Sequence, residues 1–382
     1  MYLPFLLLDL NPSTGLIKRI IGWTAIEQWS LFRDHMWLLY LLLSLVSAAA
    51  ILAVMCLFSL FAVWMERKVS AFMQCRLGPM EVGKYGCLQT IADALKLLCK
   101  EDFMPKAADK PIFWLGPVFA FTGILMAYLV IPFDRYLIVA DLNVGIFFFA
   151  SMFGIEAIGI FMAGWGSNNK WALFGAMRLV AQLVSYEIPL GLCLLTVAAV
   201  AGSLSVQDIC LAQTNGILSW YIFRNPFMWI SFVIFFIATL AECKRSPFDL
   251  PEAESELVAG FHTEYSGMRF AMFFLAEYAA MYLVSCMVAI LFFGGWSTGI
   301  RALDQSSSAL AILARIMALN VKALCFVFLQ MWLRWTLPRI RLDQVMYCCL
   351  KVLLPFSLFG FMATTLWEFL FRGQFWRVVL GM

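Results

Sequence analysis

Eight long apolar runs, separated by polar connections, make up most of this chain. A helix that spans a membrane needs about 20 predominantly apolar residues. The runs cover residues 37–64, 112–132, 143–165, 171–201, 227–241, 270–293, 316–337 and 352–371. The fifth run is short, and its helix could extend into the residues on either side. The pattern predicts an all-α fold, a polytopic membrane helix bundle of about eight spans in which residues 37–382 form a single domain.

A further helix is predicted in the first connection, residues 66–111, where apolar positions repeat at three, four and seven residues. One of its faces is apolar and the opposite face is polar: Leu88, Ile91, Ala92, Leu95 and Leu98 against Gln89, Asp93, Lys96 and Lys100. This pattern is typical of an amphipathic helix that lies along the membrane surface. The helix either covers the end of the bundle or frames an opening for a lipid-like substrate.

The N-terminal segment, residues 1–36, has the same spacing at Leu16, Ile20, Trp23 and Ile26. Its apolar stretch at residues 3–8 is short, and Asp9 follows it without the basic lead-in of a signal peptide. An interfacial amphipathic helix is therefore expected there.

Composition and the distribution of charge agree with a membrane protein. The 382 residues are 63% hydrophobic and 13% charged, whereas soluble domains are about 25% charged. The first, third, fifth and seventh connections hold 17 of the 27 basic residues. By the positive-inside rule these connections face the cytoplasm and both termini lie outside, as in a multi-pass protein of the cell inner membrane. The net charge of +3 gives no reason to expect a nucleic-acid partner.

The sequence gives little indication of a metal-binding or haem-binding site. The 11 cysteines are scattered without a CxxC spacing, and the two histidines are His35 and His262. No metal site is therefore expected, neither zinc nor iron–sulfur. The thiols are interpreted as buried and inert. If the protein takes part in redox chemistry, its electrons come from a partner.

Residues 241–270 place an acidic segment between two apolar runs. Its six carboxylates are Glu242, Asp249, Glu252, Glu254, Glu256 and Glu264. Charge at a membrane boundary is retained mainly for function, so proton or ion handling is the first hypothesis. Glu252 and Glu256 are four residues apart, and in a partly dry site such neighbours cannot all be ionised. The alternative is a solvated acidic loop, although Phe248 and Leu257 between the acids require burial.

Four carboxylates fall inside or at the end of the apolar runs, namely Glu156, Glu187, Glu242 and Glu277. A carboxylate within a spanning helix either pairs with a base or stays protonated. Arg178 is the one base predicted within one or two turns of Glu187. The two interpretations are a structural ion pair and a water-linked proton relay, and the relay is favoured.

Seven motifs stand out along the chain: RSPFDLPEAESELV at 245–258, HTEYSGM at 262–268, ERK at 66–68, RLGP at 76–79, IADALK at 91–96, AGW at 163–165 and WTLPR at 335–339. Together they resemble the H subunit of bacterial NADH-quinone oxidoreductase, whose mitochondrial counterpart is NADH dehydrogenase subunit 1. The resemblance extends from about residue 64 to 342. It departs from the usual pattern at Met80, Glu81 and Thr90, and at Lys244, which adds a positive charge beside Arg245.

The resemblance implies a subunit of respiratory complex I that joins the electron-transfer arm to the proton-pumping arm. This chain would bind no cofactor and would form the mouth and lower part of the chamber for the substrate quinone. Partner subunits of the peripheral arm would carry FMN, the terminal iron–sulfur cluster and the quinone headgroup ligands, and other membrane-arm subunits would adjoin it.

The resemblance also assigns roles by position. Six residues would line or support the quinone chamber: Arg76, Asp93, Arg178, Arg245, Asp249 and Arg269. Seven carboxylates would form the proton relay that leads from it: Glu156, Glu187, Glu242, Glu252, Glu254, Glu256 and Glu277. Quinone reduction would change the local charge, and so the protonation of the acidic segment.

Three other interpretations compete with this one. The related membrane subunit of energy-converting hydrogenases shares part of the acidic segment. A stand-alone secondary ion carrier would need a gated site, yet the sequence shows no internal repeat or paired broken helices. A purely structural anchor for a peripheral arm would leave the intramembrane carboxylates unexplained.

Overall fold

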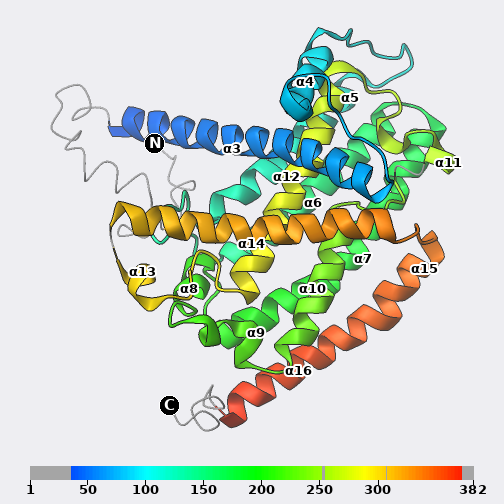
Figure 1. Cartoon of the computed structure of the whole chain (residues 1–382). Coiled ribbons are helices and arrows are strands. Elements are labelled where there is room, and N and C mark those ends of the chain that lie inside the picture. Colours follow the sequence, from blue (N-terminus) through cyan, green and yellow to red (C-terminus); the bar gives the residue numbers. More distant parts are fainter. Residues whose placement is uncertain (1–35, 252–253, 307, 372–382) are drawn as a thin grey trace.

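The computed structural model describes residues 36–251, 254–306 and 308–371, and this part of the chain is helical without a β-strand (Figure 1). Within it, seven helices are long and apolar enough to cross a membrane: Leu41–Met73, Lys110–Val130, Gly145–Gly166, Lys170–Ala201, Gly267–Phe292, Ala309–Thr336 and Leu342–Phe371. The predicted all-α membrane bundle is therefore confirmed. The fifth predicted run forms α10 (Met228–Glu242), an apolar helix of only 15 residues.

The long elements are α3 (Met36–Met73), α5 (Lys110–Ala127), α6 (Gly145–Gly166), α7 (Lys170–Ala201), α12 (Gly267–Phe292), α14 (Ala309–Thr336) and α16 (Leu354–Phe371). The short helices are α4 (Gln89–Cys99), α8 (Val206–Leu211), α9 (Tyr221–Arg224), α11 (Glu254–Leu257), α13 (Arg301–Gln305) and α15 (Leu342–Tyr347). A π-helical segment, η6 (Cys348–Leu353), joins α15 to α16. The helix predicted near the N-terminus lies outside the described residues.

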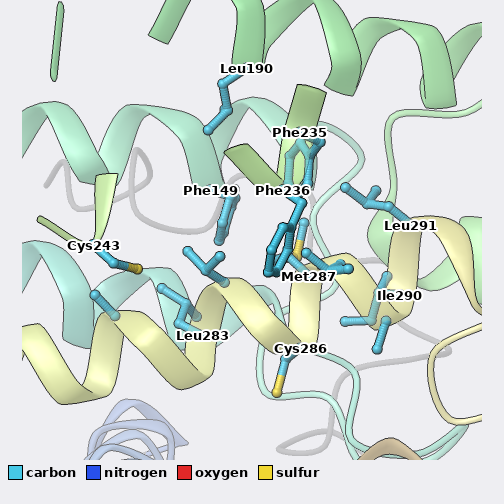
Figure 2. Close-up of a cluster of buried hydrophobic side chains, with 14 of the residues drawn as sticks. Phe149, Leu190, Phe235, Phe236, Cys243, Leu283, Cys286, Met287, Ile290 and Leu291 are labelled. Atoms are coloured by element: carbon cyan, nitrogen blue, oxygen red, sulfur yellow. The ribbon is translucent and has the colours of Figure 1, made fainter. Parts of the chain in front are cut away.

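Helix α12 is the centre of the bundle. In an apolar stretch of 18 residues, 83% of the residues of α12 are buried, whereas 17% are buried in the corresponding stretch of the first span. It packs against α3, α5, α10 and α14. Figure 2 shows Leu283, Met287 and Leu291 of α12 beside Phe235 and Phe236 of α10. Because α12 is apolar on all sides after Glu277, this part of it can be surrounded by other helices of the same chain.

Helices α5 and α6 approach closely because small residues line their contact. A Cβ on Gly123 would lie 2.8 Å from the carbonyl oxygen of Met152, and one on Gly116 would lie 3.0 Å from Ala163. Small residues at such spacing allow helices to pack backbone to backbone in a membrane. Because α6 packs so closely on α5, Glu156 of α6 lies inside the bundle, where it is 1% exposed.

The connections gather at two opposite ends, as the predicted topology requires. The odd-numbered connections, 74–109, 167–169, 243–266 and 337–341, form what we call the basic end. Hydrogen bonds join them to one another, from Asn168 to Ala107, from Ser266 to Glu101 and from Ile340 to Pro247. The even-numbered connections, 128–144, 202–227 and 293–308, form the far end and are joined likewise, from Ser205 to Asp141 and from Arg301 to Asn215.

The predicted surface helix is α4, and its apolar stripe points away from the rest of the chain. Ile91, Leu95 and Leu98 are 45%, 57% and 59% exposed. On another side of the helix, Asp93 forms an ion pair with Arg67 of α3, with Nη1 and Oδ2 2.6 Å apart. The charged side therefore holds α4 on the bundle while the apolar stripe stays open.

Helix α14 is fastened to the end of α12 by a lysine. The Nζ of Lys322 donates hydrogen bonds to the carbonyl oxygens of Phe293, Gly295 and Ser297, at 2.7, 3.0 and 2.7 Å. It also lies 4.3 Å from the centre of the Trp220 ring. Phe293 caps α12, and Gly295 and Ser297 follow in the connection, so the ammonium group ties α14 to the backbone directly after α12.

A fully buried ion pair holds the far end together. Arg315 of α14 and Asp134 are both 0% exposed, and the guanidinium meets the carboxylate twice, at 2.5 Å from Nε and 3.2 Å from Nη2. Nη1 donates to the carbonyl oxygens of Leu303 and Ser306 at 3.1 and 2.7 Å. One side chain therefore fixes two connections and the start of α14.

Removing one member of this pair should destabilise the protein strongly. Arg315→Met leaves Asp134 as an uncompensated buried charge, a change that costs about 3–5 kcal/mol. The melting temperature of the purified assembly should fall accordingly. Arg301→Met removes an exposed arginine at the same end and serves as the control. The double variant Arg315→Met with Asp134→Leu removes both charges and should melt above Arg315→Met alone. Equal melting temperatures for Arg315→Met and Arg301→Met would show that the pair does not stabilise the protein.

Candidate functional site

Five residues from four elements make a polar cluster at the basic end of the bundle: Glu66, Arg245, Glu277, Tyr278 and Arg334. We call it the Glu66 cluster. Glu66 of α3 is 5% exposed. Its carboxylate accepts hydrogen bonds from Arg245 Nη1 at 2.7 Å, the Tyr278 hydroxyl at 2.7 Å and Arg334 Nη1 at 2.5 Å. Arg245 Nε lies 2.9 Å from Glu277 of α12. The cluster therefore links α3, α12 and α14 with the connection after α10.

The chain leaves α10 by a turn that separates two adjacent cations. The N–H of Arg245 donates to the carbonyl of Leu240 and the N–H of Lys244 to that of Ala241, at 3.4 and 3.2 Å. Lys244 has a φ of 55°, in the left-handed region. This is a Schellman motif, which usually has glycine at the left-handed position. As a result, Arg245 reaches the Glu66 cluster while Lys244 reaches α6.

Lys244 and Glu156 form a second buried pair. Their Nζ and Oε1 atoms are 2.5 Å apart, and their side chains are 6% and 1% exposed. The other oxygen of Glu156 has no hydrogen-bond partner among the described residues. The sequence predicts Glu156 as a relay acid and marks Lys244 as an added charge, and the structure brings the two together.

Glu242 and Glu187 share a cavity of about 380 Å³ between α6, α7 and the end of α10. Ser151, Gly154 and Leu190 complete its wall. Glu242 is 1% exposed, and neither of its carboxylate oxygens has a hydrogen-bond partner in the described part of the chain. Two predicted relay acids thus face one space.

Glu256 of the acidic segment is exposed at the basic end. Glu256 is held by Arg178 at 2.5 Å and by Arg339 at 3.1 Å. The hydrogen bond from Arg178 lowers the pKa of Glu256. Arg178 therefore pairs with Glu256 rather than with Glu187, its neighbour along α7. Glu252 lies outside the described residues, and for Glu254 only the backbone helix is described.

Asp249 lies between these groups and the Glu66 cluster. Burial raises its pKa, an effect that Arg334 opposes and Glu277 reinforces. Its Oδ1 atom is buried without a hydrogen-bond partner among the described residues. Asp249 is therefore a carboxyl group whose ionisation depends on nearby charges.

The remaining predicted chamber residues lie around the basic end, apart from one another. Arg269 lies 2.9 Å from Asp102 and stacks 3.9 Å from the centre of the Trp114 ring. Arg76 is exposed and donates to the side chain of Gln74 at 2.6 Å. Asp93 is the α4 anchor described above. The structure thus brings Arg245 and Asp249 close to the buried acids, leaves Arg76 and Asp93 nearer the surface, and buries Arg269 beside Asp102 and Trp114.

Three members of the Glu66 cluster, namely Glu66, Tyr278 and Arg334, are not among the site residues predicted from the sequence. A signal was present, since Glu66 and Arg334 both stand in motifs or at ends of apolar runs, where a charge enters the membrane. Their pairing joins positions 268 residues apart, which no local pattern indicates. Among the described residues no group of three or more His, Cys, Asp or Glu side chains could hold a metal ion.

Comparison with known proteins supports one family. A sequence model described as NADH dehydrogenase matches residues 46–365. The NADH-quinone oxidoreductase H subunit of Chlorobaculum tepidum is 54% identical over 312 residues, which cover 80% of this chain and 87% of that protein. The H subunit of Anaeromyxobacter dehalogenans is 43% identical over 363 residues, covering 92% of this chain and 86% of that protein.

A pH dependence of stability follows from His262, in the turn η5 (Gly260–His262). Burial, with help from Lys244, lowers its pKa from 6.5 to about 4. Below pH 6.5 the unfolded chain binds a proton that the folded chain does not bind until about pH 4, so stability falls as the pH drops through this window. The loss reaches about 3 kcal/mol.

The measurement is the melting temperature of the assembly between pH 7.5 and 4.5, for the wild type and His262→Gln. The glutamine variant should lose less stability on acidification, so the two curves should converge at low pH. A constant offset between them would show that His262 does not titrate in this window.

Proposed function

The chain belongs to the family of the NADH-quinone oxidoreductase H subunit, a membrane component of respiratory complex I, and we propose that it couples quinone reduction at its basic end to proton movement through its buried carboxylates. The observation that carries the proposal is the cavity shared by Glu242 and Glu187. A buried carboxylate without a cation or a donor is far more stable with a proton than without one. Glu242 is therefore suited to hold a proton and release it when the nearby charge changes.

The basic end has the properties that a quinone chamber needs. A quinone has a polar headgroup and an isoprenoid tail, and α4 offers an exposed apolar stripe beside charged side chains. We assign the lining or support of this chamber to Arg76, Asp93, Arg178, Arg245, Asp249 and Arg269. Trp114, stacked under Arg269, adds an apolar surface next to a fixed positive charge.

Coupling would begin with the charge change at the quinone. Its reduction to quinol takes up two electrons and two protons, so the charge near the headgroup changes until protons arrive. Asp249, whose pKa burial raises, would respond first because its ionisation is set by the surrounding charges. Arg245 would carry the response inward, since it contacts both Glu66 and Glu277. Glu242 and Glu187 would then exchange protons across their cavity, with Glu252, Glu254 and Glu256 leading from the chamber.

The remaining parts of the reaction would belong to partners. Peripheral-arm subunits would supply FMN, the terminal iron–sulfur cluster and the headgroup ligands, and other membrane-arm subunits would receive the protons. The seven apolar helices place the chain in a membrane. We propose the cell inner membrane, with the basic end toward the cytoplasm.

Purification of a tagged chain from membranes distinguishes this function from the ion-carrier alternative. A subunit of an oxidoreductase complex should co-elute with iron–sulfur proteins and quinone reductase activity. A carrier would elute alone.

Replacing the cavity acids should impair coupled turnover. Glu242→Gln and Glu187→Gln remove the exchangeable proton with little change in shape, and groups that transfer protons typically contribute a factor of about 10²–10⁴. We expect proton pumping by the assembled complex to fall at least about tenfold. Glu252→Gln should act in the same direction.

Glu368→Gln is the control for this experiment, because Glu368 pairs with Arg224 at 3.3 Å near the far end, away from the cavity. Pumping rates and stoichiometry equal to wild type in both cavity variants would refute the relay.

A further inference from the structure

Two adjacent cations after α10 pair with three acids and leave Glu242 without an ion pair among the described residues. Arg245 contacts Glu66 and Glu277, and Lys244 contacts Glu156. Glu242, on the cavity that it shares with Glu187, has no hydrogen-bond partner among the described residues. These pairings follow from the Schellman turn after α10, which points successive side chains in different directions.

The placement of Lys244 carries an energetic cost that calls for an explanation. The residue adopts a left-handed φ, which a lysine rarely does and a glycine adopts without strain. Its ammonium group is withdrawn from water to a site 6% exposed. A buried cation is stable only beside an opposite charge, and at 2.5 Å the carboxylate of Glu156 supplies one.

We propose that Lys244 is a positioning residue that keeps Glu156 ionised, so that Glu156 is a fixed countercharge and the mobile proton resides on Glu242 and Glu187. This inference rests on the proposed proton-coupling function. The ammonium of Lys244 neutralises Glu156 without a proton transfer. The Glu156 carboxylate then disfavours a second carboxylate at Glu242, and this effect outweighs the opposing effect of the Lys244 ammonium on the same acid.

The titratable groups that face this pair come from several elements. Glu242 ends α10, Glu277 projects from α12, and His262 lies in η5 next to Lys244. Glu187 of α7 faces Glu242 from the other side of the cavity. Helix α5, which packs closely on α6, has one ionisable residue, Lys110 in its first turn, and no acid or base along the rest of its length. The nearest positive charge to Glu156 is therefore that of Lys244.

The test uses the purified complex and infrared difference spectroscopy of protonated carboxyl groups, which have a C=O stretching band that carboxylates lack. Lys244→Asn removes the ammonium group, and asparagine is the residue that best replaces glycine in the left-handed position. At neutral pH this variant should gain a band equivalent to one carboxyl group, from Glu156. The band should be absent from the double variant Lys244→Asn with Glu156→Gln, and Lys244→Arg should restore the wild-type spectrum.

A second comparison does not require Lys244 variants to assemble. In the wild-type background, Glu156→Gln should remove no protonated carboxyl band, whereas Glu242→Gln should remove one. A band lost in Glu156→Gln, or no gain in Lys244→Asn, would overturn the assignment of Lys244.

These spectra separate the inference from the proposed function. If Glu242→Gln and Glu187→Gln leave pumping unchanged while the spectra behave as expected, the relay is wrong and the Lys244 pair stands. If pumping falls but Glu156→Gln loses a band, the relay stands and Glu156 is one of its proton carriers.

Discussion

A charge inside this bundle is stable only when an opposite charge or a proton accompanies it, and most of the polar architecture follows from that constraint. The far end satisfies it with Asp134 and Arg315, both fully buried and linked twice. The basic end satisfies it with two arginines on Glu66. Where an acid has neither an ion-pair partner nor a hydrogen-bond donor among the described residues, as at Glu242, a proton would provide the compensation. The same requirement for a compensating charge therefore accounts for the buried ion pairs that stabilise the bundle and for the acids that could carry protons.

The two ends of the bundle use their charges differently. At the far end Arg315 pairs with Asp134, and both Arg315 and Lys322 donate to backbone carbonyls. The basic end holds acids that share cations or lack them, among them Glu277, Asp249 and Glu256. Chemistry that depends on a change of charge is therefore expected at the basic end, where we also propose the quinone chamber.

The apolar runs predicted the fold well because each spanning helix must be apolar over its own length, whatever surrounds it. The fifth run, the short one predicted at residues 227–241, is the short apolar helix α10, Met228–Glu242. The acids of the candidate site could be identified one by one, because an ionisable residue within an apolar run is conspicuous. The roles assigned to them remain predictions.

The partners of those acids could not be predicted. Arg178 is near Glu187 along α7, yet it pairs with Glu256, 78 residues away. Glu66 and Arg245 meet across 179 residues. Such pairings depend on how helices are arranged around α12, and helical spacing alone says nothing about that arrangement. The direction of Lys244 likewise depends on a left-handed turn that is normally signalled by glycine.

The lysine that fastens α14 to the end of α12 determines how a disturbance at the other end can propagate. Lys322 lies near the middle of α14, bonded to three carbonyls, whereas Arg334 lies in the last turn of that helix and touches Glu66. Arg315 anchors the opposite end of the same helix to Asp134. With the helix held at Arg315 and at Lys322, a displacement of Arg334 has to be absorbed in the residues that separate Lys322 from Arg334, and α14 transmits little of it to the far end.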